Sequence, residues 1–333
     1  MTLKERIICA INHKETDLIP YDFGLSGDYQ KRMADYYNDP DFMNRIDRYY
    51  TFTGPSGYPR EKKISDNVYQ DAFGVQRETN EINGFGIALN HVFNEETFDE
   101  YEFPDPTVSV LYAGIPEHIE KNKHRFIIAG GASYFETAWF TYGLENVLSD
   151  MAGNEFFMFK LLDRIHEFNL KKIEQLIKFD IECVHINDDY GHQHGLIMGP
   201  VLWRKYFKPY LKEAASKIKS GGKYVRLHSC GDISEIIPDL VEIGIDILNP
   251  FQPEAMDVYA IKREYGKYLT FDGGVSEQNV MVSGTPDDVE RETRDKMRVL
   301  GKGGGYIVGP SQGITQDVPL ENVDRFIKVI TTQ

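Results

Sequence analysis

The stretch RLHSCGDI places a histidine and a cysteine two residues apart, at His228 and Cys230. It continues a run that reads as a β-strand, over residues 223–231. Side chains alternate along a strand, so His228 and Cys230 are expected to point to the same side as Arg226. Imidazole and thiolate are good ligands for Zn²⁺. The stretch predicts either half of a metal site or a core histidine beside a buried thiol.

A zinc site needs further ligands beside His228 and Cys230. Zinc takes four ligands, and a catalytic zinc site keeps one position open for water or substrate. Residues with a suitable side chain stand close after other predicted strands: Glu136, Asp188, Asp189, His192, His194 and Asp272. The residue types alone leave the choice among them open.

Eight β-like runs, mostly separated by helical patterns, must position these residues. The runs cover 18–24, 48–54, 125–131, 181–188, 223–231, 245–250, 269–274 and 305–310. Helical patterns cover 155–179, 202–220, 234–244 and 286–301. The last has Thr285 as its expected N-cap and Pro286 in its first turn. This alternation predicts an α/β fold, a (β/α)8 TIM barrel in a single domain over residues 1–333.

Residues 66–106 interrupt the alternation. The segment DAFGVQRETNEINGFGIALNHVFNE alternates in polarity and contains an Asn-Gly pair, which is typical of a β-hairpin. We expect a β-hairpin excursion over the barrel there. An open doubly wound sheet is the second candidate fold, but no GxGxxG motif follows the first strand.

Polar residues follow most of the predicted strands, where a (β/α)8 barrel carries its chemistry. Among them are Asp22, Glu136, Asp188, Asp189, Asn249, Asp272 and Gln312. The structure of these loops does not require so many polar side chains. Their presence therefore favours an enzyme.

The composition excludes several other classes of function. The 333-residue chain has 52 acidic and 37 basic residues and a formal net charge of −15, with no basic cluster for nucleic acid. No apolar run has the length of a membrane span, and the N-terminal stretch lacks a signal-peptide core, so a cytoplasmic protein is expected. Three cysteines, Cys9, Cys183 and Cys230, argue against a disulfide framework.

Several stretches resemble the uroporphyrinogen decarboxylase superfamily, which includes the corrinoid-dependent methyltransferases. They are TLKERIICAINHKETDLIPYDFG, INDDYGHQHGLIMGPVLWRKYFKPYL, GKYVRLHSCGDISEIIPDLVEIGIDILNPFQPEAMD and GGGYIVGPSQGITQDVPLENV. The resemblance extends over essentially the whole chain. It implies a (β/α)8 barrel with its site at the carboxyl ends of the strands.

The two branches differ in their motifs. Decarboxylases carry an Arg-rich stretch after the first strand that clamps the carboxylates of the tetrapyrrole, whereas this chain reads DFGLSGDYQKR there, with Arg32 as its first arginine. The methyltransferase branch binds zinc through a His-x-Cys on strand five and a second Cys after strand eight. His228 and Cys230 match the first part, but Gln312 replaces the second Cys. Glu136, Asp189 or His194 would then complete the set, with Glu136 as our prediction.

The resemblance therefore implies a zinc-dependent methyltransferase serving a separate corrinoid (cobalamin) protein. The donor would be a small O-methyl compound, foremost an aryl methyl ether, or an N-methyl compound, with zinc as a Lewis acid. The predicted catalytic residues are Asp22, Asp188 and Asp189. The predicted substrate-binding residues are Phe23, Tyr134, Trp139, Asn249 and Gln312. The expected partners are the corrinoid protein, the methylated substrate and, in a homodimer, a second copy of the chain.

Two alternatives stay open. One is a metal-free decarboxylase of a smaller acid, in which Asp22 or Asp188 stabilises the protonated substrate. The other is a non-catalytic barrel that binds a ligand or a corrinoid, suggested by Gln312 in place of a cysteine.

Overall fold

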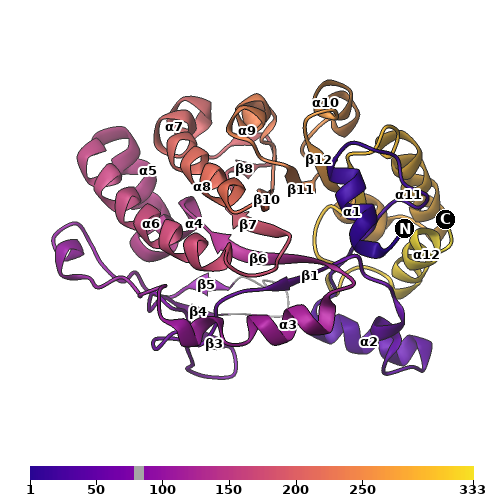
Figure 1. Ribbon diagram of the computed structural model, residues 1–333, viewed down its shortest axis with the longest axis horizontal. Coiled ribbons are helices and arrows are strands. Elements are labelled where there is room, and N and C mark those ends of the chain that lie inside the picture. The colour runs from indigo at the N-terminus through magenta and orange to yellow at the C-terminus, as the bar shows by residue number, and fades with distance from the viewer. Residues whose placement is uncertain (79–85) are drawn as a thin grey trace.

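A curled sheet of seven parallel strands forms the centre of the molecule (Figure 1). The computed structural model describes residues 1–78 and 86–333. In spatial order the strands are β1 (Tyr50–Thr53), β6 (Phe126–Ala132), β7 (Cys183–Asn187), β10 (Tyr224–His228), β11 (Ile247–Phe251), β12 (Thr270–Val275) and β13 (Tyr306–Pro310). Helices connect them and cover the outside of the sheet. The predicted barrel-type α/β fold is confirmed.

The first predicted strand, over 18–24, does not form as a regular strand. The segment lies beside β13, where Tyr21 bridges Val308 and the backbone N–H of Asp22 donates to the Val308 carbonyl. Pro20 has no amide proton with which to continue the ladder. On the side of β1, Asp22 forms an ion pair with Arg48 at 3.1 Å. The segment thus takes the place of a barrel strand with only part of its pairing.

The twelve α-helices of the described residues include helices in all four predicted regions. They are α1 (Leu3–Ile11), α2 (Gly27–Tyr37), α3 (Ile115–Asn122), α4 (Phe135–Tyr142), α5 (Leu144–Gly153), α6 (Glu155–Leu176), α7 (Gly199–Tyr206), α8 (Lys208–Ser220), α9 (Ile237–Ile243), α10 (Val258–Tyr265), α11 (Pro286–Leu300) and α12 (Leu320–Thr331). Thr285 caps α11 as predicted. The single helix predicted over 202–220 is two helices, because Pro209 cannot donate the backbone hydrogen bond that would join α7 to α8.

No helix within residues 1–78 and 86–333 is both long enough and apolar enough to cross a bilayer.

The excursion begins before the predicted residue 66 and is larger than a single hairpin. It contains a four-stranded antiparallel sheet of β2 (Lys62–Lys63), β3 (Val68–Gln70), β4 (Gln76–Glu78) and β5 (Ile87–Ala88). The predicted Asn-Gly turn, Asn83–Gly84, lies outside the described residues. The excursion is anchored to the helical layer, since the Phe73 ring packs on Phe168 of α6 with centroids 5.1 Å apart. A smaller hairpin, β8 (Gly191–His192) and β9 (Gly195–Leu196), follows β7.

Candidate active site

Three potential metal ligands meet at the ends of β7 and β10. Asp189 follows β7, His228 ends β10, and Cys230 stands two residues later. The Nε2 atom of His228 lies 3.4 Å from the Sγ atom of Cys230 and 3.5 Å from the Oδ1 atom of Asp189. One donor atom from each residue lies within 4.8 Å of the other two. We call Asp189, His228 and Cys230 the ligand triad, because donors this close can share one cation.

Two loops pack backbone against backbone to bring the triad together. The backbone N–H of Cys230 donates to Oδ1 of Asp189 at 2.7 Å. A Cβ atom on Gly191 would meet the Cys230 carbonyl oxygen at 2.7 Å. Gly231 has a φ of +81°, and a Cβ atom there would meet the Gly191 carbonyl carbon at 2.4 Å. Only glycine fits at both positions, so the triad depends on this glycine contact.

Asn249 fixes the orientation of the His228 ring. Register places it opposite His228 on β11, and its Oδ1 lies 2.7 Å from Nδ1 of His228. A carboxamide oxygen accepts a hydrogen bond, so Nδ1 carries the proton and Nε2 offers its lone pair to the triad. Burial lowers the pKa of His228, which favours the neutral imidazole that a metal requires.

The donor set fits zinc. Burial raises the pKa of the Cys230 thiol, and the Asp189 carboxylate raises it further. A divalent cation reverses this preference, because it stabilises the thiolate. Imidazole, thiolate and carboxylate are all common zinc ligands, and three of them leave one position open. The triad therefore suits a catalytic zinc ion better than a closed structural site.

Glu136 and Gln312 lie outside the triad. Oε2 of Glu136 accepts a hydrogen bond from Nδ2 of Asn187 at 2.6 Å. Burial raises the pKa of Glu136 to about 8, and the nearby carboxylates of Asp188 and Asp189 contribute to this. Gln312 is exposed in the loop after β13. The structure thus brings Asp189, rather than Glu136, to the predicted His-x-Cys pair.

Asp188 holds the beginning of α4. Its buried carboxylate accepts hydrogen bonds from the backbone N–H groups of Tyr134 and Glu136 at 2.7 and 2.9 Å, and from Oη of Tyr190 at 2.9 Å. Burial raises the pKa of Asp188 to about 7, although these hydrogen bonds favour the carboxylate. With its oxygens engaged, Asp188 positions Glu136 rather than facing a substrate. Asp22 is likewise buried, against Arg48.

The aromatic residues predicted to hold an arene pack in or against the core instead. Phe23 contacts Phe326 edge-on, with ring centroids 5.9 Å apart. Tyr134 is fully buried, with its Oη 2.9 Å from Nδ1 of His166. Trp139 stacks on Phe140 with centroids 3.8 Å apart. These contacts occupy the rings, so a substrate would have to displace core packing to reach them.

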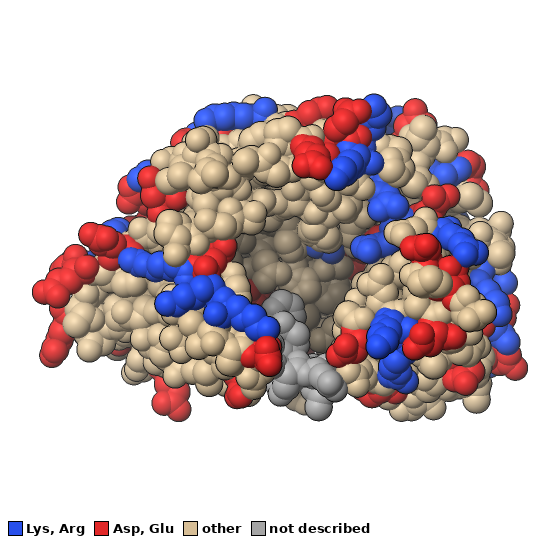
Figure 2. Space-filling view, turned by 90° about the horizontal axis from the view of Figure 1, so that it is seen from below, with Lys and Arg blue, Asp and Glu red and all other residues tan. Residues whose placement is uncertain are grey.

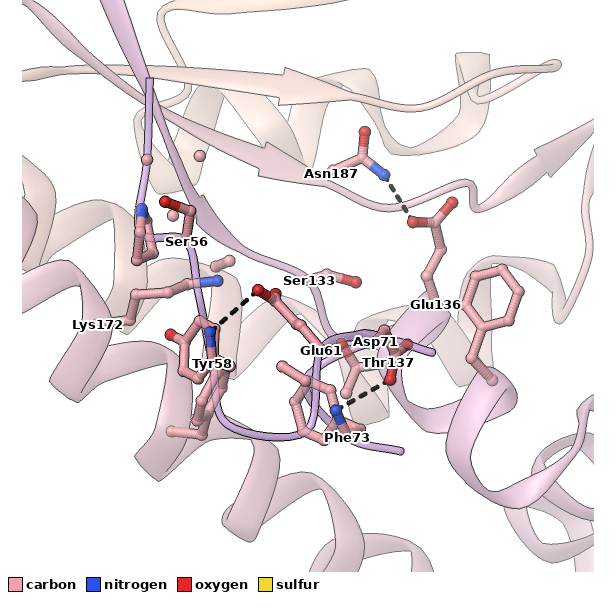
Figure 3. Close-up of a pocket in the computed structure, with 18 of the residues that line it drawn as sticks. Ser56, Tyr58, Glu61, Asp71, Phe73, Ser133, Glu136, Thr137, Lys172 and Asn187 are labelled. Carbon is pink, nitrogen blue, oxygen red and sulfur yellow. Dashed lines mark hydrogen bonds between the residues drawn. The ribbon is translucent and has the colours of Figure 1, made fainter. Parts of the chain in front are cut away.

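A cavity of about 640 Å³ lies near the triad, although none of the three triad residues lines it. Figure 3 shows part of its lining. His185 lines it, and its ring centroid is 6.1 Å from that of His228. Glu136 and Asn187 lie on one side, and Lys172 of α6 lies on the opposite side. The aromatic lining comes from Tyr58, Phe73, Phe140 and Phe168. The molecule is also visibly hollowed at the centre of one face (Figure 2). The space suits a small organic substrate.

Sequence reasoning missed this lining for a physical reason. Tyr58 and Phe73 belong to the long segment between β1 and α3, whereas Phe140 and Phe168 belong to helices. None of them stands directly after a barrel strand. An aromatic residue in such a place reads as ordinary core, and only the fold of the excursion brings these rings to the cavity.

Lys172 gives the protein a distinctive pH dependence. Burial lowers its pKa to about 8, from 10.5 in an unfolded chain. Below pH 8 the folded protein must bury a charged ammonium group, whereas between pH 8 and 10.5 only the unfolded chain keeps the proton. The contribution of Lys172 to stability therefore becomes more favourable as the pH rises through this range.

We expect Lys172→Met to raise the free energy of unfolding by about 1 to 3 kcal/mol at pH 7, after a discount for partial exposure. The gain should shrink between pH 8 and pH 10 in urea unfolding. Lys171→Met is the matched control, because Lys171 is exposed and pairs with Glu167 at 2.7 Å. A gain that is independent of pH would show that Lys172 is not a buried cation.

A buried ion pair forms the floor below the triad. The guanidinium of Arg226 contacts Oδ2 of Asp272 through Nη2 at 2.8 Å and Nε at 3.1 Å. Its Nη1 lies 3.1 Å from Nδ1 of His185. The side chain also lies over the Tyr50 and Phe52 rings, at 5.6 and 5.5 Å from their centroids. Arg226 and His228 share one side of β10, as the strand alternation predicted.

Comparison with known proteins identifies the family. Residues 67–333 match the family model described as uroporphyrinogen decarboxylase (URO-D). The chain belongs to this family, which confirms the resemblance found in the sequence.

Two curated relatives carry methyltransferase names. The methylated-thiol–coenzyme M methyltransferase of Methanosarcina mazei is 29% identical over 102 residues, which is 31% of this chain and 26% of that protein. The methylcobamide:CoM methyltransferase MtaA of Methanosarcina barkeri is 24% identical over 131 residues, which is 39% of this chain and 36% of that protein. The chain thus spans about a quarter and about a third of the length of these relatives.

A solved structure shares the fold over the whole chain. The structure of a methyltransferase from Methanosarcina mazei covers 100% of this chain and 99% of its own, with a TM-score of 0.75 and 16% sequence identity. The likeness shows the architecture alone.

Proposed function

We propose that this protein is a zinc-dependent methyltransferase that passes a methyl group from a small methylated compound to a corrinoid carried by a partner protein. The observation that supports this most is the ligand triad beside a cavity of about 640 Å³. The names of the two curated relatives agree with methyl transfer. The favoured donor is an O-methyl compound, foremost an aryl methyl ether, with an N-methyl compound second.

Different residues of the chain have different roles in the proposed methyl transfer. Asp189, His228 and Cys230 hold the metal, and Asn249 fixes the reactive nitrogen of His228. Bound there, zinc supplies Lewis acidity to the heteroatom that carries the methyl group. The aromatic lining of the cavity packs against an arene and excludes water. Glu136, with a pKa of about 8, keeps a proton on the cavity wall at neutral pH, where it serves the leaving oxygen.

The test is methyl transfer to cobalt. Zinc-loaded protein, a reduced corrinoid protein and a panel of methoxylated arenes should yield methylcobalamin, seen by its absorbance. The Cys230→Ser variant should be inactive with the same mixture. Failure across the panel, with a corrinoid protein shown to accept methyl groups from another methyltransferase, would contradict the proposal.

The cavity gives less support to decarboxylation of a tetrapyrrole. A substrate with many carboxylates requires paired cations. Within the described residues the basic side chains that line the cavity are Arg77 and Lys172, and Arg77 is already paired with Asp71 at 2.8 Å. One remaining lysine suits a substrate with a single negative charge.

A further inference from the structure

Among the described residues, the charged side chains of Arg77, Glu61 and Glu136 at the cavity have partners within the protein, and one other does not. Arg77 pairs with Asp71 at 2.8 Å. Oε2 of Glu61 accepts two backbone N–H groups, at 2.8 and 3.0 Å. Glu136 accepts a hydrogen bond from the Asn187 amide on the same side of the cavity. Lys172 is the exception, since no carboxylate of the described residues lies within ion-pair distance of its Nζ atom.

The ammonium group of Lys172 is in an unusual position for a cation without a counter-charge. Its ammonium group lies 5.3 Å from the centroid of the Phe168 ring, which is on the same helix and also lines the cavity. Burying an ammonium group without a counter-charge is costly, so such groups are retained where a ligand completes them.

A second donor stands nearby without an acceptor. Tyr58 lines the same cavity and is 6% exposed, and its hydroxyl is buried without a hydrogen-bond partner among the described residues. Figure 3 shows Tyr58 and Lys172 on the same side of the cavity. A buried hydroxyl that has no partner in the protein is expected to find one in a ligand. Two donors without an acceptor select an anionic oxygen group.

The position of this pair fixes which end of a ligand it meets. Lys172 lies across the cavity from Glu136 and Asn187 (Figure 3). Asn187 ends β7, two residues before Asp189 of the triad. A molecule whose reactive end faces the triad therefore presents its far end to Lys172 and Tyr58.

We propose that Lys172 and Tyr58 form a subsite for an anionic oxygen group, a carboxylate or a sulfonate, carried by the methyl donor at the end away from its methyl group. The identity of the ligand as a methyl donor rests on the proposed function. The subsite itself rests on the two unpaired donors and their place in the cavity. The substrate class is thus a methoxylated aromatic acid rather than a neutral aryl ether.

Calorimetric binding to metal-free protein tests this subsite directly. The probes are 4-methoxybenzoate, 4-methoxybenzenesulfonate and the neutral 4-methoxybenzamide. The wild-type protein should bind at least one of the anions ~10-fold more tightly than the amide. The two anions distinguish a carboxylate subsite from a sulfonate subsite.

Substitutions then assign the preference to residues. Lys172→Met should bring the anion and the amide within ~2-fold of each other, and Lys172→Arg should restore part of the preference. Tyr58→Phe should weaken anion binding ~3-fold or more. Lys171→Met should bind as wild type, because Lys171 is an exposed neighbour on the same helix that pairs with Glu167. Thermal unfolding checks that each variant is folded.

The outcomes separate this subsite from the proposed function. Equal binding of anions and amide by the wild type, no binding of any probe, or full anion binding by Lys172→Met overturns the subsite. Selective anion binding that Lys172→Met abolishes, without methyl transfer to a competent corrinoid protein, keeps the subsite and removes the function. Methyl transfer that proceeds equally from methoxybenzene and 4-methoxybenzoate keeps the function and removes the subsite.

Discussion

Replacing Asp189 with asparagine should release zinc from the protein, whereas replacing Glu136 with glutamine should leave zinc in place. Asparagine removes the anionic ligand of the triad but keeps an oxygen that can accept the backbone hydrogen bond from Cys230. We expect zinc affinity to fall by roughly 100-fold or more, comparable to the loss on His228→Ala. Glu136 binds Asn187 instead, so Glu136→Gln should change zinc affinity little.

Competition with a chromophoric chelator measures this affinity, and elemental analysis gives the zinc content. His194→Ala is the matched control, because His194 is an exposed histidine in the same loop as Asp189. Asn249→Leu should weaken zinc binding by roughly 10- to 100-fold, since the His228 ring then loses its hydrogen-bond partner. If Asp189→Asn retained zinc, or Glu136→Gln lost it, the zinc ligands would not be the residues of the triad.

Arg226→Met should cost about 3 to 5 kcal/mol of unfolding free energy. Arg226 and Asp272 are 4% and 2% exposed, and two hydrogen bonds join them. Removing the guanidinium leaves the Asp272 carboxylate buried beside the Tyr50 hydroxyl, with no cation to balance its charge. A smaller loss would follow if the two groups were exposed to solvent.

The double variant Arg226→Met with Asp272→Asn separates the pair from its packing. It should be more stable than Arg226→Met alone, because no unpaired charge is left in the barrel. Lys121→Met is the surface control: its pair with Glu117 is 70% and 72% exposed, so its loss should change stability far less. Urea unfolding of the four proteins gives the values. A loss below about 1 kcal/mol for Arg226→Met would mean that the pair does not stabilise the barrel.

The positions of residues that depend on strand alternation could be predicted from the sequence. The period of two placed Arg226 and His228 on one side of β10, and the order of strands and helices predicted the barrel. The hydrophobic pattern and the Thr285 cap predicted α11 almost to its ends. These features depend on local spacing, so the sequence carries them directly.

The rest of the site depends on contacts between distant segments. Asp189 reaches Cys230 through the glycine contact of Gly191 and Gly231, which no periodicity encodes. Tyr58 and Phe73 reach the cavity only because the excursion folds back onto α6. The sequence contains several carboxylates that could be the third ligand. Only the geometry of the loops shows that Asp189 lies beside the His-x-Cys pair. Strand ends predicted where the site lies but not which side chains face it.

Under the proposed function, the glycine contact also couples zinc binding to the folding of the protein. The loops that meet there follow different strands, so Asp189 approaches Cys230 only after β7 and β10 have paired. An unfolded chain offers zinc the His-x-Cys pair but does not hold Asp189 beside it. With zinc at the triad, the native barrel binds it more tightly than the unfolded chain does. Free zinc then draws the folding equilibrium toward the barrel by mass action, and a shortage of zinc leaves more chain open to proteolysis.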